Sequence, residues 1–229
     1  MKNEDELINH IFGYKADSAD GFVIGLGNTG CMIADELLKI SDNDYTRKYI
    51  KVIELDSSKD FKEYEDERLL RKLIGKEILY DKDAYLSDFR ENKHHTANPR
   101  YGEDAIKKEK ELILALIDRY KPRVLLIISA FGGSVGTGAT TELVKYIKAR
   151  DIMTIGLIVL PFKFERERRA IAERALDDIK SYFDNILTVD LNRFINLDEE
   201  ATLNMTMKHI DRSIARIAES ILTLYSRQV

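Results

Sequence analysis

SAFGGSVGTGATTELV (residues 129–144) follows an apolar run, RVLLIISA (123–130), and leads into a segment of helical character. Four glycines fall within seven positions of it: Gly132, Gly133, Gly136 and Gly138. Glycine has no Cβ atom, so the backbone can take left-handed dihedral angles and approach another group closely. A strand that ends in such a turn before a helix predicts a phosphate-binding loop, with close packing and no ligand as the alternative.

Short apolar segments alternate with longer amphipathic ones along the whole chain. They cover residues 21–27, 49–56, 123–130, 152–162 and 185–191. Val, Ile and Leu dominate them without strict polar alternation, which is typical of strands buried on both faces. We therefore expect an α/β fold with a doubly wound parallel sheet, in a single domain over residues 1–229 with an N-terminal extension over 1–20. The charged stretch 59–95 predicts a helix and an exposed loop.

Composition narrows the class of protein. The formal net charge is −4 and Cys31 is the single cysteine, so we expect no nucleic-acid partner and no disulfide framework. No apolar run reaches the roughly 20 residues of a membrane span, and the start MKNEDELINH lacks the pattern of a signal peptide. These features predict a cytoplasmic protein without a direct membrane anchor. Cys31 is interpreted as a small buried residue that packs a helix on the sheet.

A second glycine-rich turn, GLGNTG (25–30), follows the first apolar segment. Alone, it fits a dinucleotide-binding fingerprint, with Asp56 as the acidic residue that binds a ribose. An NAD-dependent oxidoreductase is therefore one alternative. The second turn at 132–138 disfavours it, and Ala139 stands where a Walker A loop has lysine. We expect phosphates to be bound by backbone N–H groups, helix starts and a magnesium ion held through the phosphates.

Several motifs occur in the order found in one protein family. FGGSVGTGATTEL resembles the glycine-rich signature of the tubulin/FtsZ superfamily, and GLGNTG resembles the family's first phosphate loop. ELDSSKDF places Asp56 on the aspartate of the next strand end. HTANPRYGEDA, LPFKFERERRAIAE and VDLNRF are similar to three further motifs of the family. The matches extend over nearly the whole chain and imply a Rossmann-like domain that binds GTP or GDP.

The resemblance also implies a set of nucleotide contacts. Glu165 and Arg169 fall on residues that contact the ribose and phosphate, and Asn192 falls on the asparagine that binds the guanine edge. No catalytic residue and no metal-ligating side chain is assigned. The implied phosphate-loop residues are Gly25, Gly27, Asn28, Thr29, Gly30, Ala97, Asn98, Pro99, Gly132, Gly133, Ser134, Val135, Gly136, Thr137 and Gly138.

The C-terminal part of the sequence predicts one long helix from Asp198 to about Ser226, roughly 40 Å in length. Its apolar stripe is Leu203, Met207, Ile210, Ile214, Ile217, Ile221 and Leu224. The segment resembles the family's central helix, which places Met207 where an aromatic stacks on guanine and Asp211 on the residue that binds N1 and N2. A carboxylate accepts both guanine donors, so guanine is favoured over adenine. Core packing is the alternative for Met207.

Some positions depart from the family pattern. Met32 replaces an asparagine near the base, Val135 replaces a threonine near the terminal phosphate, and His94, His95 and Thr96 precede Asn98. The chain stops at Val229, after the long helix, where relatives carry the loop that activates water in the next subunit; INLDEEA (195–201) precedes the helix and is interpreted as its capping segment.

We therefore expect GTP hydrolysis to be slow in isolation and to need a neighbouring subunit or partner. The expected partners are a guanine nucleotide and either another copy of the chain or a full-length FtsZ-like protein. A nucleotide-gated adaptor that binds a filament without turnover is the alternative.

Overall fold

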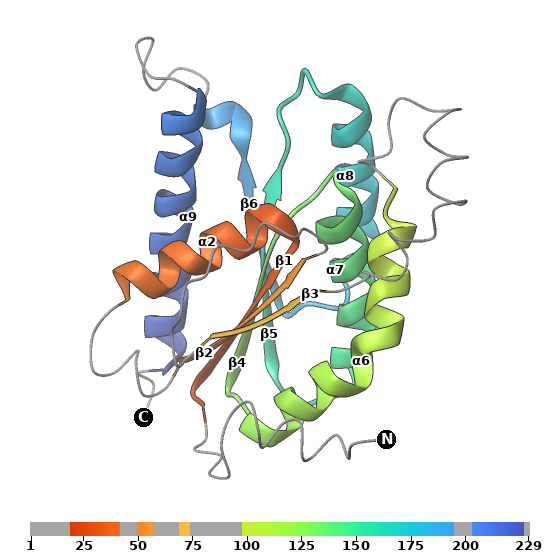
Figure 1. The fold of residues 1–229 in the computed structure, drawn as a ribbon, viewed down its shortest axis with the longest axis vertical. Helices are drawn as coiled ribbons and strands as arrows, with labels where there is room; N and C mark the ends of the chain where they lie inside the picture. The colour runs from red at the N-terminus through yellow and green to blue at the C-terminus, as the bar shows by residue number, and fades with distance from the viewer. Residues whose placement is uncertain (1–18, 42–49, 57–68, 74–97, 195–202, 227–229) are drawn as a thin grey trace.

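The computed structural model describes residues 19–41, 50–56, 69–73, 98–194 and 203–226 (Figure 1). The strands are β1 (Gly21–Leu26), β2 (Ile50–Asp56), β3 (Leu69–Leu73), β4 (Val124–Ala130), β5 (Met153–Leu160) and β6 (Asn185–Asp190). The helices are α2 (Gly27–Ile40), α6 (Arg100–Tyr120), α7 (Ser134–Ile147), α8 (Arg166–Ile179), α9 (Leu203–Ser226) and the 3₁₀ turn η2 (Leu191–Phe194).

Six parallel strands form one sheet in the order β3-β2-β1-β4-β5-β6. This is the strand order of a doubly wound nucleotide-binding fold, and it confirms the predicted class. Five of the strands fall on the five predicted segments. The sixth, β3, was not predicted, because its sequence LLRKL lies in the charged stretch 59–95; the prediction of helix and loop is wrong at residues 69–73.

Two apolar cores lie on opposite faces of the sheet (Figure 1). One joins the sheet to α6, α7 and α8, and the other joins it to α2 and α9. Strands β1 and β4 are buried along almost their whole length because side chains of both faces meet a helix layer. The edge strand β6 differs, since Leu187 and Thr188 are exposed, so the expectation of burial on both faces is wrong there.

The long helix α9 is confirmed over Leu203–Ser226, while its predicted start at Asp198 lies outside the described residues. The predicted apolar stripe is partly wrong: Ile217 is 38% exposed and Leu224 is 65% exposed. Ala215 and Ala218 are buried instead, because small residues allow α9 to approach the sheet and α2 closely. No helix in the described part of the chain has the length and apolar character that a membrane crossing requires.

Candidate functional site

Helix starts gather at the edge formed by the carboxyl ends of the strands. Helix α2 follows β1 directly, and α7 begins four residues after the end of β4. Among the described residues, Leu26 and Gly133, which precede these two helices, make no side-chain capping hydrogen bond. By contrast, the backbone N–H of Arg100 at the start of α6 donates to Asn98 Oδ1 at 3.2 Å. The starts of α2 and α7 therefore offer N–H groups of the kind that binds phosphate.

The predicted phosphate loops lie against one another. Gly27 has φ +72° and Gly132 has φ +93°, which favour glycine on backbone grounds. A Cβ on Gly27 would lie 2.8 Å from the Gly136 nitrogen. A Cβ on Gly138 would overlap the Pro99 carbonyl oxygen. The structure thus brings together residues 27–30, 98–99 and 132–138, which the family resemblance implies as phosphate loops.

Close backbone packing explains two of the four glycines without a ligand. Gly136 and Gly138 are needed for backbone contacts within the chain, whether or not a ligand binds, because a Cβ at either position would meet a carbonyl oxygen. Close packing, the alternative considered for the turn, therefore accounts for these two residues. Phosphate binding is favoured instead by the two helix starts and by the loops that meet beside them.

Hydroxyl groups that the sequence analysis did not single out hold the glycine-rich turn in place. Buried Ser129 donates to the carbonyl oxygen of Gly136 at 2.9 Å, and Thr140 donates to the same oxygen at 2.7 Å. Thr137 was a predicted contact, and its hydroxyl accepts the N–H of Gly132 at 2.9 Å. A serine at the end of an otherwise apolar strand was the available signal for Ser129.

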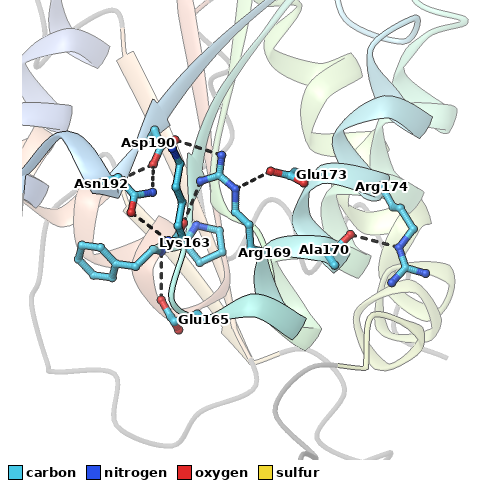
Figure 2. Close-up of polar contacts among 10 residues, drawn as sticks. Lys163, Glu165, Arg169, Ala170, Glu173, Arg174, Asp190 and Asn192 are labelled. Atoms are coloured by element: carbon cyan, nitrogen blue, oxygen red, sulfur yellow. Dashed lines mark hydrogen bonds and ion pairs between the residues drawn. The ribbon is translucent and has the colours of Figure 1, made fainter.

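Glu165 and Arg169, the predicted ribose and phosphate contacts, lie at the start of α8 (Figure 2). Glu165 accepts the N–H of Phe162 at 3.2 Å and pairs with Arg168. Arg168 also donates to the carbonyl oxygen of Gly132 at 3.2 Å, which connects α8 with the glycine-rich turn. The side chains of Glu165 and Arg169 bind different partners within the chain.

Arg169 and Asn192 are both held by Asp190, a residue that the sequence analysis did not assign (Figure 2). Arg169 also donates to Glu173 at 2.7 Å and to the carbonyl oxygen of Pro161 at 3.0 Å. Burial alone would raise the pKa of Asp190, but hydrogen bonds from Arg169 and Asn192 outweigh it and hold the pKa at about 2. Asp190 is therefore an ionised acceptor at neutral pH.

Asp211 has a different environment on α9. Its side chain is only 3% exposed, and its Oδ1 atom has no hydrogen-bond partner among the described residues. Burial, with a smaller contribution from Glu36 on α2, raises the pKa of Asp211 to about 6. A buried carboxylate oxygen without a donor is costly, and such groups are typical of ligand sites.

The orientation of α9 places Asp211 toward the same edge of the sheet. Leu222, near the other end of α9, packs against Gly21 at the start of β1, so α9 runs antiparallel to the strands (Figure 1). Met207, one turn before Asp211, is half-buried against the core on this face. Its packing agrees with the core alternative and leaves the predicted stacking on a base as a prediction.

The remaining predicted positions are only partly described. Asn28 is exposed and Thr29 half-buried in the first turn of α2, whereas Cys31 is buried as expected. Asp56 ends β2, but its side chain is outside the description, as are Ala97 and the segment His94–Thr96. Within the described residues, no three His, Cys, Asp or Glu side chains cluster in a way that would hold a metal ion.

The strand order and the helix starts at one edge define a Rossmann-like α/β domain. Residues 22–199 match the family described as "Tubulin/FtsZ family, GTPase domain". The chain belongs to this family, which confirms the resemblance seen in the motifs.

Individual relatives agree with this assignment. "Cell division protein FtsZ 1" of Pyrococcus furiosus is 24% identical over 208 residues, which cover 90% of this chain and 50% of the relative. "Cell division protein FtsZ" of Wigglesworthia glossinidia brevipalpis is 25% identical over 130 residues, or 53% of this chain and 33% of the relative. The chain spans half or less of the length of these relatives.

Solved structures show the same fold. An empty FtsZ dimer from M. jannaschii superposes with a TM-score of 0.71 at 20% identity, covering 100% of this chain and 60% of that one. A GTPγS-bound protofilament of CetZ2 from Haloferax volcanii gives 0.70 at 19% identity, with 92% and 60% covered.

Proposed function

We propose that this chain is a guanine-nucleotide-binding domain that serves a filament of the cell-division type. The proposal is supported mainly by the environment of Asp211, a buried carboxylate whose Oδ1 atom accepts no hydrogen bond from any described residue. Guanine presents N1–H and an N2 amino group side by side, and a carboxylate can accept both. Adenine offers an acceptor at N1, which a carboxylate would repel.

The phosphates would lie at the starts of α2 and α7, where backbone N–H groups lack side-chain caps. Residues 25–30, 97–99 and 132–138 form the proposed phosphate loops, with Asp56, Glu165 and Arg169 toward the ribose. Magnesium bound through the phosphates would neutralise part of their charge. The chain's own contribution to hydrolysis would be positioning and electrostatic stabilisation.

Slow GTP hydrolysis, completed by a neighbouring subunit or a partner, is the proposed activity. Two facts about relatives support it at the level of the family: their names assign them to cell division, and one neighbour was solved as a GTPγS-bound protofilament. The proposed location is the cytoplasm, and the proposed folding unit is the single domain 1–229.

A calorimetric titration of nucleotide-free protein with GDP, GTP, ATP and NAD in magnesium buffer tests the proposal. We expect guanine nucleotides to bind and Asp211→Ala to weaken them about 100-fold, since a lost pair of charged hydrogen bonds costs roughly 3 kcal/mol. Asp178→Ala, an exposed position near the other end of α8, is the matched control and should bind normally.

Two other results would favour a different function. Binding of NAD without GTP would support an oxidoreductase and contradict the proposal. Phosphate release is then measured with and without a full-length FtsZ. Guanine-nucleotide binding with no turnover under either condition would contradict the proposed hydrolysis and favour the adaptor.

A further inference from the structure

Asp190 connects two side chains that the proposed site uses (Figure 2). Its Oδ2 atom accepts from Arg169 Nη2 at 3.0 Å. Its Oδ1 atom accepts from the backbone nitrogen of Asn192 at 2.9 Å and from Asn192 Nδ2 at 2.5 Å. One carboxylate at the end of β6 therefore orders the start of α8 and the turn η2 at the same time.

The other end of the Asn192 amide is also fixed. Asn192 Oδ1 accepts the backbone N–H of Lys163 at 3.0 Å. A backbone N–H can only donate and an ionised carboxylate can only accept, so these two partners determine which end of the amide is nitrogen. Rotation of the amide by 180° would face oxygen with carboxylate and nitrogen with N–H. Asn192 is thus held in one orientation: one Nδ2 hydrogen bonds Asp190, and the second has no partner among the described residues.

Arg169 keeps Asp190 in place. Its side chain is only 15% exposed, and its guanidinium bonds Asp190, Glu173 and the Pro161 carbonyl, so three of its five donors have partners within the chain. Glu173 is more exposed than Asp190, and the contact drawn for it in Figure 2 is with Arg169. The two carboxylates therefore share Arg169, but only Asp190 also reaches Asn192.

We propose that Asp190 is a positioning residue for guanine specificity: it fixes Asn192 as a hydrogen-bond donor toward the O6 acceptor of the base. This inference rests on the proposed function. Guanine has an oxygen at position 6 where adenine has an amino group, so a donor held in one orientation favours guanine. This hydrogen bond from Asn192 to O6 is separate from the hydrogen bonds that Asp211 would accept from N1 and N2.

The test compares GDP with 6-thio-GDP, which keeps the N1 and N2 donors but replaces O6 by a weak sulfur acceptor. We expect the native chain to prefer GDP about tenfold, as for one hydrogen bond. Asp190→Asn should reduce that preference to about twofold, because a neutral amide can donate as well as accept and leaves the Lys163 N–H alone to orient Asn192. Glu173→Gln is the matched control, since it also removes a carboxylate beside Arg169, and it should retain the preference.

A double variant separates positioning from general stability. If Asp190 acts through Asn192, adding Asp190→Asn to Asn192→Ala should not change the GDP preference further. Each variant is titrated below its melting temperature. An equal loss of GDP and 6-thio-GDP affinity in Asp190→Asn would overturn the proposal, and so would the same loss of preference in Glu173→Gln.

An NMR measurement without nucleotide tests the positioning of Asn192 independently of guanine-nucleotide binding. The side-chain amide protons of Asn192, assigned in an NMR spectrum by their loss in Asn192→Ala, should be widely separated in the native chain and in Glu173→Gln. They should move together in Asp190→Asn. Unchanged protons in Asp190→Asn would overturn the positioning role alone, whereas a native chain that binds no guanine nucleotide would overturn the specificity role together with the proposed function.

Discussion

Asp190 and Asp211 are two carboxylates of one proposed site, but the chain treats them in opposite ways. Asp190 receives hydrogen bonds on both oxygens and has a pKa of about 2, whereas Asp211 is buried without a donor on Oδ1 and has a pKa of about 6. The first stabilises the folded chain and the second destabilises it. The protein itself satisfies Asp190, whereas under the proposed function a guanine base would supply the donors that Asp211 lacks.

The largest expected effect is a difference in sign between two identical substitutions. Asp211→Asn should raise the free energy of unfolding at pH 8 by about 2 kcal/mol, because it removes a desolvated charge. Asp190→Asn should lower it by roughly 1–2 kcal/mol, because it removes a charge that Arg169 stabilises. Urea unfolding in the absence of nucleotide measures the unfolding free energy of both variants. A loss of stability in both would contradict the predicted difference in sign.

The pH dependence of stability should show the same contrast within the native chain. The pKa of folded Asp211 is raised from 3.8 to about 6, so the folded state binds more protons than the unfolded state between these values. Its contribution to the unfolding free energy should therefore fall by about 2 kcal/mol as pH rises from 4 to 7. Unfolding curves of the native chain and Asp211→Asn across that range check this, and parallel profiles would contradict it.

The smallest expected effect is on nucleotide affinity. Guanine donors bind the ionised form of Asp211, and with a pKa of about 6 only a quarter of the molecules carry that form at pH 5.5. GDP should therefore bind about fourfold more weakly at pH 5.5 than at pH 7.5. Calorimetry at the two pH values measures the ratio. Asp211→Asn should bind weakly and equally at both, and a native chain with no pH dependence would show that Asp211 is not the base contact.

Sequence patterns predicted the central strands because apolar runs are a local property, whereas the loop residues were assigned by their resemblance to the family's motifs. Apolar runs of strand length, and glycines after them, identify the sheet and its carboxyl edge. The strand β3 was missed because LLRKL has charged residues inside it and around it. On α9, counting large apolar residues overlooked Ala215 and Ala218, which are buried because they are small.

The hydrogen bonds around Asp190 could not be predicted from sequence patterns. Asp190 and Arg169 are 21 positions apart, and Asn192 and Lys163 are 29 apart, so their contacts depend on how β5, α8 and β6 pack. Motif matching identified Arg169 and Asn192 individually but could not show the residue that joins them. Asp211 is different, because the resemblance of its segment to the family's central helix implied its role from the sequence, four positions after Met207.

The contact between Gly138 and Pro99 has a mechanical consequence. Gly102 meets α7 in the same way, since a Cβ there would lie 2.7 Å from the Ser134 carbonyl oxygen, so the backbones of α6 and α7 touch without intervening side chains. A close-packed joint of this kind transmits displacement and absorbs little of it. A displacement of residues 98–99 would therefore be passed to α6 with little loss, and the carbonyl oxygen of Tyr120 at the far end of α6 accepts the N–H of Ala19, beside the start of β1.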